Sequence, residues 1–453
     1  MIAVQRASTD RAATYGLLDP VITAQLNLSH ARTPTESGLS AGIATDDRYS
    51  VSAGIARTFA PGTSLSFTLT QAVNRSEFPL RTGLGFGDQT IVTGPDVSTS
   101  MNLEVSQPLL RGFGREVVLV GEAIASRTID VREREVLQVA SARQLELNGA
   151  YAELRYAAEE VTLRERSLAR TEEQQRIATA ELQAGQIAAI EVDLVEEQVA
   201  MRSEALLLAR SELDRRSREL QRIIGVSPRQ LRSLVASDGL FEPPNVQFRP
   251  QLCDEAESAS ADMAVLESQA TLARARLIST ADNRRPNLQA TAGLTQSGLD
   301  SAWASSLGQA LTFDAPTIYG GVVFSTPLRN RAARAEHTGA LADVDAARNE
   351  VSVVADGLCF SIHDAVTALN LLAERDGVAA YRVEIAGRAL RAEQARFQQG
   401  LSTVQAGLDA LENLEAAEIG LLRVRTDAEI TWWQLEHLRG RLLQDVAALL
   451  SAE

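Results

Sequence analysis

Apolar positions recur at intervals of seven residues in four long stretches of the chain, which begin at Leu147, Val192, Val344 and Leu414. Heptad spacing favours helices that supercoil around one another. No proline interrupts residues 115–184, so one helix there could run for about 100 Å at 1.5 Å per residue. The pattern therefore predicts long paired helices rather than short helices around a globular core.

Between the helical stretches the period changes from about 3.5 to two, as in strands with one apolar and one polar face. The turn Ala60-Pro61-Gly62-Thr63 joins two of these segments as a hairpin. The alternating segments are residues 21–29, 51–59, 65–70, 97–106, 287–295 and 318–326, the last two separated by a Gly/Ser-rich loop. Such strands fit an outer-membrane barrel and also a half-buried soluble sheet, so the pattern alone leaves both open.

The same layout occurs twice along the chain. A Ser-x-Pro-Leu phrase around Pro108 returns around Pro327, and the phrase ending at Gly185 returns, 215 positions later, at Gly400. Glycine readily takes the left-handed conformation that ends a helix, so Gly185 and Gly400 are predicted to close helical hairpins. The predicted segments are a first repeat 1–225 (strands within 21–107, hairpin 115–225), a linker 226–252, and a second repeat 253–453 (helix 253–283, strands 287–326, hairpin 330–450).

Composition and charge narrow the function classes. The formal net charge of -15 argues against nucleic acid as a partner, because phosphate binding depends on clustered Lys and Arg. No window approaches the roughly 18 uninterrupted apolar residues of a spanning helix, so membrane insertion would have to use strands. The sequence after Met1 also lacks the basic and apolar stretch of a secretory signal.

Candidate chemistry is sparse. Cys253 and Cys359 fit no CxxC or CxxH spacing, and we expect two plain thiols rather than a disulfide or a zinc site. None of the four histidines has a second histidine at helical spacing, and His363-Asp364 is adjacent in sequence, so the two side chains point apart on a helix. No metal, no cofactor and no enzymatic activity are predicted.

The order of elements around Pro108, Gly185, Pro327 and Gly400 resembles the TolC family of outer-membrane efflux proteins over nearly the whole chain. The resemblance implies a mainly helical fold with long coiled-coil hairpins and four barrel strands per protomer. It also implies a homotrimer in outer-membrane lipid, with a twelve-stranded barrel and a periplasmic helical tunnel. A periplasmic adaptor protein and an inner-membrane pump would be its partners, with the hairpin ends at Gly185 and Gly400 as docking points.

The family constricts its tunnel just past the hairpin turns, where acidic residues stand in this sequence. Glu191 and Asp409 match such positions, and three of each would form rings that favour cations. As a structural alternative, both are solvated faces of helices. By the same resemblance Phe397 is a third gate candidate, although the best-known member has tyrosine there. The sequence also departs from that protein at Ala406, where it has an acid, and at Ser402, where it has arginine.

Two asymmetries complicate the duplication. Pro20 to Pro108 spans about 47 residues more than Pro286 to Pro327, and the extra residues could be an extracellular elaboration or additional strands. Few residues precede Pro20, and we expect a longer precursor that encodes a signal peptide and most of a helix.

The predicted function is a passive outer-membrane duct of a tripartite efflux or type I secretion system. The alternative is a soluble coiled-coil scaffold with a small β domain.

Overall fold

The computed structural model describes residues 2–36, 41–80, 89–234, 236, 238–239, 241–314 and 316–443. These residues form two compact units, and each unit draws on both sequence repeats. The first unit comprises Met1–Arg132 and Ser268–Arg348, and the second comprises Glu133–Glu267 and Asn349–Glu453. The two sequence repeats therefore do not correspond to the two compact units.

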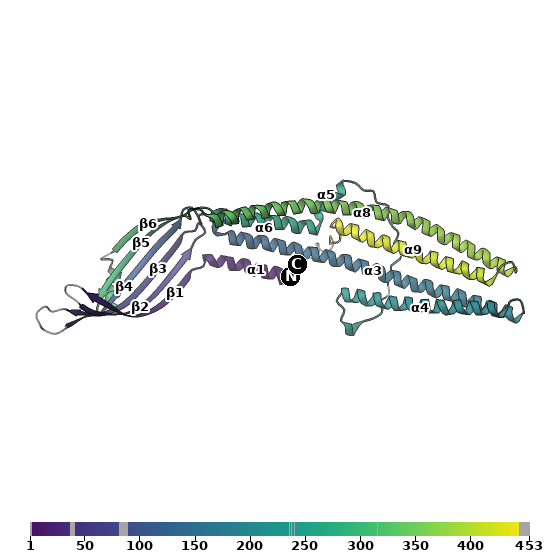
Figure 1. Cartoon of the computed structure of the whole chain (residues 1–453), viewed down its shortest axis with the longest axis horizontal. Helices are drawn as coiled ribbons and strands as arrows, with labels where there is room; N and C mark the ends of the chain where they lie inside the picture. The colour runs from purple at the N-terminus through teal and green to yellow at the C-terminus, as the bar shows by residue number, and fades with distance from the viewer. Residues whose placement is uncertain are drawn as a thin grey trace. The chain divides into compact units, whose positions relative to one another are not determined.

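The first unit contains one antiparallel sheet of six strands in sequence order (Figure 1). The strands are β1 (Val21–Glu36), β2 (Ala41–Thr58), β3 (Ser64–Leu80), β4 (Gln89–Pro108), β5 (Asn287–Asp300) and β6 (Pro316–Ser325). The expectation of four strands per chain was wrong. The extra residues of the first repeat are the paired strands β2 and β3, whose alternating segments join through the tight turn after Phe59.

The two faces of this sheet differ in chemistry from edge to edge. Directly paired residues share a face. One row across all six strands is wholly apolar: Ile22, Ile55, Phe67, Leu103, Leu294 and Ile318. The adjacent row, on the opposite face, is Thr23, Gly54, Thr68, Asn102, Thr295 and Thr317. Five of these six apolar residues are solvent-exposed in the isolated chain, with Ile22 at 79% and Ile318 at 81%, and Leu294 is half-buried. A soluble half-buried sheet would cover such a face.

The strands join the helices through a junction of prolines, glycines and backbone hydrogen bonds. Pro108 is the last residue of β4, and the amide of Leu109 extends the β4–β5 ladder by donating to the carbonyl of Leu288 at 2.7 Å. The amide of Gly112 donates to the buried carboxylate of Asp282 at 2.8 Å. Gly112 has φ +80°, which favours glycine at this bend. Pro327 follows β6 and precedes the long helix of the second hairpin.

Three of the helices in the first unit are short, and the other three enter it from longer elements. They are α1 (Ile2–Thr14), the helical turn α2 (Arg115–Val118), the start of α3 (Val120–Gln183), the end of α6 (Ala261–Asn283), α7 (Trp303–Thr312) and the start of α8 (Arg331–Gln398). Arg11 of α1 forms an ion pair with Glu122 of α3 at 2.8 Å. Helix α7 was not predicted: it occupies the connection between β5 and β6 that was expected to be a loop.

The second unit is built from the two helical hairpins. It contains most of α3, then α4 (Ala189–Ile223), α5 (Gln251–Ala259), part of α6, most of α8, and α9 (Val404–Leu438). The helix predicted over 253–283 is two helices, α5 and α6, separated at Ser260. Its largest apolar cluster centres on Ile362 and Leu369 of α8 and Leu435 of α9, in agreement with the predicted pairing of long helices.

Cys253 and Cys359 form a disulfide between α5 and α8, so the expectation of two free thiols was wrong. The cysteines are 106 residues apart and follow no metal-binding or redox motif, which is why spacing could not reveal the pair. Their Cα atoms come within 5.1 Å because α5 packs beside α8. Disulfides persist in oxidising compartments such as the periplasm, so the pair agrees with an exported protein.

Helix α8 includes an 18-residue window with mean hydropathy 1.3, apolar enough to cross a membrane by length and composition. Only 11% of that window is buried within the chain. The helix has 68 residues and continues through polar segments on both sides, as expected of a long helix that pairs with others. Its exposed apolar positions therefore mark a surface for another helix rather than a membrane span.

Candidate functional site

Both hairpins end in the same turn. Gly185 and Gly400 have φ of +73° and +72°, the left-handed conformation predicted for them. After α3, the amide of Gln186 donates to the carbonyl of Glu181 at 2.9 Å; after α8, the amide of Leu401 donates to that of Arg396, also at 2.9 Å. This pairing satisfies carbonyls at the helix ends and reverses the chain within a few residues.

The three predicted gate residues lie close to these turns but in different surroundings. Glu191 is half-buried in the first turn of α4. Asp409 is exposed on α9 and accepts a hydrogen bond from the side chain of Gln405 at 2.7 Å. Phe397 is half-buried against an apolar cluster that includes Val192 and Leu408. Phe397 thus packs between the hairpins, whereas Asp409 is open to solvent.

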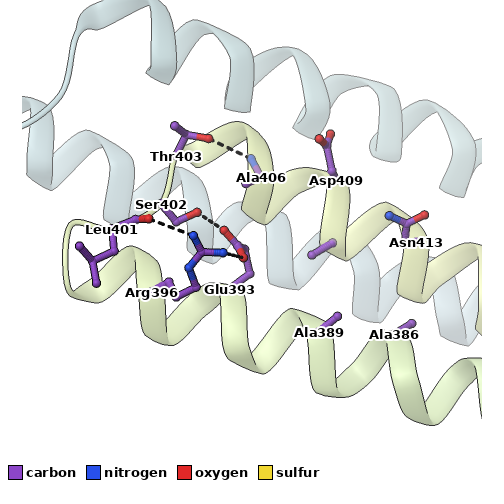
Figure 2. Close-up of a pocket in the computed structure, with 11 residues that line it drawn as sticks. Ala386, Ala389, Glu393, Arg396, Leu401, Ser402, Thr403, Ala406, Asp409 and Asn413 are labelled. Atoms are coloured by element: carbon purple, nitrogen blue, oxygen red, sulfur yellow. Dashed lines mark hydrogen bonds and ion pairs between the residues drawn. The ribbon is translucent and has the colours of Figure 1, made fainter.

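A shallow hollow of about 540 Å³ lies beside the second turn, between α8 and α9. Figure 2 shows Asp409 and Asn413 projecting from α9 along it, with Glu393 and Arg396 on α8 below the turn. The hydroxyl of Ser402 donates to Glu393, which also pairs with Arg396 at 3.2 Å. Ser402 replaces the arginine of the best-known family member, so in this chain the serine is held by a contact inside its own hairpin.

A buried ionic cluster joins the two hairpins farther from the turns. Glu415 of α9 accepts hydrogen bonds from Arg164 and Ser167 of α3. Arg202 of α4 lies 3.4 Å from the same carboxylate and donates to the Ser167 hydroxyl at 3.1 Å. The side chains of Arg202 and Glu415 are only 7% and 10% exposed. We name this group the Glu415 cluster; it ties three helices from both repeats together.

Two further charge contacts join α3 to α9. Arg155 of α3 pairs with Glu429 of α9, with both side chains under 10% exposed, and donates to the backbone carbonyl of Gly239 at 2.9 Å. Burial lowers the pKa of the Arg155 guanidinium from its ordinary value, but arginine stays charged because that value is so high. Glu153 pairs with Arg423 of α9 at 3.0 Å.

Sequence patterns did not reveal these charged residues as a group. Each arginine is more than 200 residues from Glu415 in sequence. In the sequence, these charged residues look the same as the solvent-exposed charged residues around them. A weak signal was available: Glu415 directly follows Leu414, an apolar position of the fourth heptad row, so its side chain begins at the edge of the packed face. A charge there needs a partner from a neighbouring helix.

Comparison with known proteins relates part of this chain to a family. Residues 252–441, most of the second repeat, match the sequence model of the outer membrane efflux protein family. This part of the chain is similar to that family, and solved structures extend the likeness of fold over almost the whole chain. The match and the TolC-like fold agree with the predicted identity, and a channel family supports the prediction that the protein is not an enzyme. Curated protein sequences give no match.

Solved structures share the fold over almost the whole chain at low sequence identity. The outer-membrane channel OprN aligns with a TM-score of 0.66 at 15% identity, covering 96% of this chain and 85% of OprN. VceC of Vibrio cholerae gives 0.66 at 14%, with 97% and 91% covered. CmeC of Campylobacter jejuni, also a channel, gives 0.66 at 12%, with 100% and 84% covered.

The match over residues 252–441 and the shared fold agree with the predicted general function, an efflux channel of the outer membrane. The exposed apolar face of the sheet agrees with that location, because it faces lipid in an inserted barrel while the polar face lines an aqueous interior. The soluble scaffold, the alternative reading of the sequence, would leave this face uncovered in water.

Proposed function

We propose that three copies of the chain assemble into one continuous duct that carries substrates passively across the outer membrane. Six strands from each of three copies would give an 18-stranded barrel, in place of the twelve strands that the family resemblance implied. Six is an even number, so β1 of one copy can pair antiparallel with β6 of the next and the barrel can close. Barrels of 16 to 18 strands leave a water-filled channel.

The observation that carries this proposal is the pair of open edges on an amphipathic sheet. In the described part of the chain, β1 and β6 each have a strand neighbour on one side only. An unpaired edge cannot face hydrocarbon, because its backbone groups would lack hydrogen-bond partners. A sheet with one exposed apolar face and two open edges is therefore incomplete in a membrane until further copies close it.

The hairpins support assembly independently of the strands. Leu194, Met201 and Leu208 form an exposed row at intervals of seven on α4, and Leu371, Val378 and Ile385 form another on α8. The most exposed members are Leu208 at 66% and Val378 at 71%. Rows with this period fit against helices of the same kind, so we infer that the α4 and α8 rows are covered by neighbouring copies.

The partners follow from the same proposal. The hairpin ends at Gly185 and Gly400 would dock a periplasmic adaptor, which couples the duct to an inner-membrane pump of a tripartite efflux or type I secretion system. Their sharp turns expose a compact surface of few residues, as a docking point requires. The pump would select the substrate, and the duct would supply passage.

We further propose that the tunnel closes near these turns. Three copies of Asp409 would form a ring of carboxylates open to the lumen, supported by its exposure on α9. Glu191 would form a second ring on α4. Phe397 would act indirectly, because its packing against Val192 and Leu408 holds α8 against α4 and α9. Pro108 and Pro327 would set the direction in which each helical pair leaves the barrel.

Imaging of the detergent-extracted protein tests the assembly. We expect a threefold particle with 18 barrel strands. A monomer, or a threefold particle with fewer than 18 strands, would contradict the proposal. A variant lacking residues 41–80 provides a matched comparison, because removal of β2 and β3 leaves β1 and β4 antiparallel. Barrel diameter grows roughly linearly with strand number, so single-channel conductance of the open barrel should fall to roughly half.

A double substitution tests the gate separately. Changing Asp409 to Asn removes a charge without changing size, and Glu191→Gln does the same on the other hairpin. We expect the double variant to lose a several-fold preference for cations over anions in planar bilayers. Glu412→Gln, an exposed position on the same helix as Asp409, is the control. Unchanged ion selectivity in the double variant would contradict the carboxylate rings but leave the barrel proposal intact.

A further inference from the structure

Helix α7 lies on the apolar face of the sheet rather than beyond its end. Gln71, Thr99 and Gly298 are direct partners across β3, β4 and β5, in a row that continues to Val51 and Leu26. The hydroxyl of Ser306 in α7 lies 2.6 Å from that of Thr99 and donates to the carbonyl of Gly298 at 3.2 Å. Since a direct row shares one face, α7 covers the side that carries Leu69, Met101 and Leu103.

Close packing holds α7 against β5. A Cβ atom on Gly298 would come within 2.2 Å of the carbonyl oxygen of Ser306 and 2.8 Å of the amide nitrogen of Ala310. Ser306 and Ala310 are fully buried and one turn apart, so two small residues rest directly on the strand. At the end of β5, the side chain of Gln309 donates to Asp300 at 3.0 Å and accepts from the amide of Leu299 at 3.1 Å. The helix is therefore a fixed part of the sheet surface.

The height of α7 above the Pro108 end of the sheet matches the height of an outer-membrane apolar band. Along β4 the face that α7 covers reads Val105, Leu103 and Met101, then polar Thr99 and the buried Val97. Nine positions separate Pro108 from Thr99, which is about 31 Å along a strand, or roughly 23 Å along the membrane normal for a tilt near 40°. Outer-membrane barrels have an apolar band about 25 Å tall. Thr99, and α7 with it, thus lies at the outer boundary of the membrane.

One flank of α7, next to the side that packs on the sheet, is apolar. Trp303, Leu307 and Leu311 follow one another at intervals of four and form a stripe on the helix. Trp303 is 45% exposed and Leu311 is 60% exposed, while Ser306 and Ala310 are covered. A water-exposed helix instead places its large apolar residues against the protein, where water does not reach them. Phe313, directly after the helix, is also 53% exposed.

We propose that α7 is a lipid-binding helix on the outer surface of the barrel, whose stripe of Trp303, Leu307 and Leu311 enters the outer leaflet of the outer membrane. Lipid is the fitting occupant because the stripe continues the apolar face of the sheet at its outer boundary, where tryptophan is favoured at membrane interfaces. The proposal depends on insertion of the sheet into the membrane and is independent of the number of strands in the assembled barrel.

Tryptophan fluorescence tests this contact. The chain has three tryptophans, so W432F/W433F leaves Trp303 as the sole reporter in the otherwise intact channel. In proteoliposomes with brominated phosphatidylcholine, we expect blue-shifted emission that bromines near the headgroup quench at least twofold more strongly than bromines near the bilayer centre. Emission that aqueous iodide quenches and bromolipid does not would overturn the proposal, as would emission insensitive to both.

A second measurement avoids the two Trp substitutions on α9. A photo-crosslinking amino acid at Leu311 of the natural sequence should join to phospholipid in proteoliposomes, and one at Asp409 should give at least tenfold less lipid adduct. Equal adduct at both positions would contradict α7 as a lipid-binding helix.

A matched pair of substitutions sharpens the fluorescence result. Leu311→Glu should weaken bromolipid quenching of Trp303 at least twofold, and Ser305→Glu, exposed on another side of α7, should leave the quenching unchanged. Loss of membrane insertion by every variant would instead point to a failure of the barrel itself.

Discussion

The two hairpins end in the same backbone turn, yet the residues after the turn differ. Three residues beyond Gly185, Ala188 begins α4 without a side-chain cap. Three residues beyond Gly400, Thr403 begins α9 and its hydroxyl accepts from the amide of Ala406 at 3.3 Å. Ser402 adds its contact with Glu393. Glycine thus determines the shape of both turns, while capping makes the second turn locally more stable than the first.

Farther from the turns the comparison reverses, because the hairpins share their strongest contacts. The Glu415 cluster draws on α3, α4 and α9, and the Arg155–Glu429 pair again joins α3 to α9. Opening of one hairpin end exposes part of the apolar cluster around Phe397, whereas separation of the hairpins must also expose buried charges. We infer that local motion at the ends and separation of the hairpins have different free-energy costs, and the following three sets of substitutions measure them.

The largest effect is expected from Glu415→Ala. Removal of the carboxylate leaves Arg202 buried without its opposite charge, which typically costs about 3–5 kcal/mol. Denaturant unfolding of the detergent-solubilised protein, followed by helical circular dichroism, should show this loss. Glu412→Ala, an exposed change on the same helix, should alter the free energy of unfolding by less than about 0.5 kcal/mol. Equal effects of the two changes would mean that the Glu415 cluster does not hold the hairpins together.

An intermediate effect is expected from valine at either turn. Gly185→Val and Gly400→Val each place a β-branched residue at positive φ, at a cost of about 1–2 kcal/mol. A Cβ atom meets nothing within 4 Å at either glycine, so the penalty comes from the backbone alone. Amide hydrogen exchange at the turns should increase about equally in both, and export should be lost while the barrel still assembles.

Asparagine is the matched control at these turns, since it tolerates the left-handed conformation. Gly185→Asn and Gly400→Asn should retain most of the protection from exchange and most of the export. If the valine variants exported normally, the hairpin ends would not be the docking points. If only one of them failed, docking would depend on a single hairpin.

The smallest effect is expected from exchanging the caps. Thr403→Ala should destabilise the second turn by about 1 kcal/mol, and Ala188→Thr should stabilise the first by a similar amount, because a threonine side chain satisfies an amide that alanine leaves without a partner. Hydrogen exchange of the peptides covering residues 186–192 and 401–407 measures both. Exchange rates that do not move in opposite directions would show that capping is not the source of the difference between the turns.

Local pattern identified the elements that depend only on neighbouring residues. Gly185 and Gly400 were found because a left-handed glycine commonly ends a helix. The strands were found because side chains alternate between the two faces of any sheet. The extra segment of the first repeat illustrates the limit. Its alternation was visible at residues 51–59 and 65–70, but whether these residues entered the main sheet depended on pairing with β1 and β4.

The charged and sulfur contacts were missed for a related reason. Glu415 and Arg202 are 213 residues apart, and Cys253 and Cys359 are 106 residues apart. Neither pair has a spacing that a local rule can recognise. Family resemblance assigned Phe397 to the gate. Its packing against Val192 of α4 and Leu408 of α9 could not be read from the sequence, because both residues lie on other helices.

The sequence by itself determined the long helices, the two turns, the alternating strands and their duplication, because helix and strand periods and left-handed glycines act within a few residues. Only the tertiary structure decided that six strands share one sheet, that α7 lies on its apolar face, and that the Glu415 cluster and the disulfide join distant helices. These features depend on which segments meet in space, and the free energy that selects them comes from contacts between residues far apart in the chain.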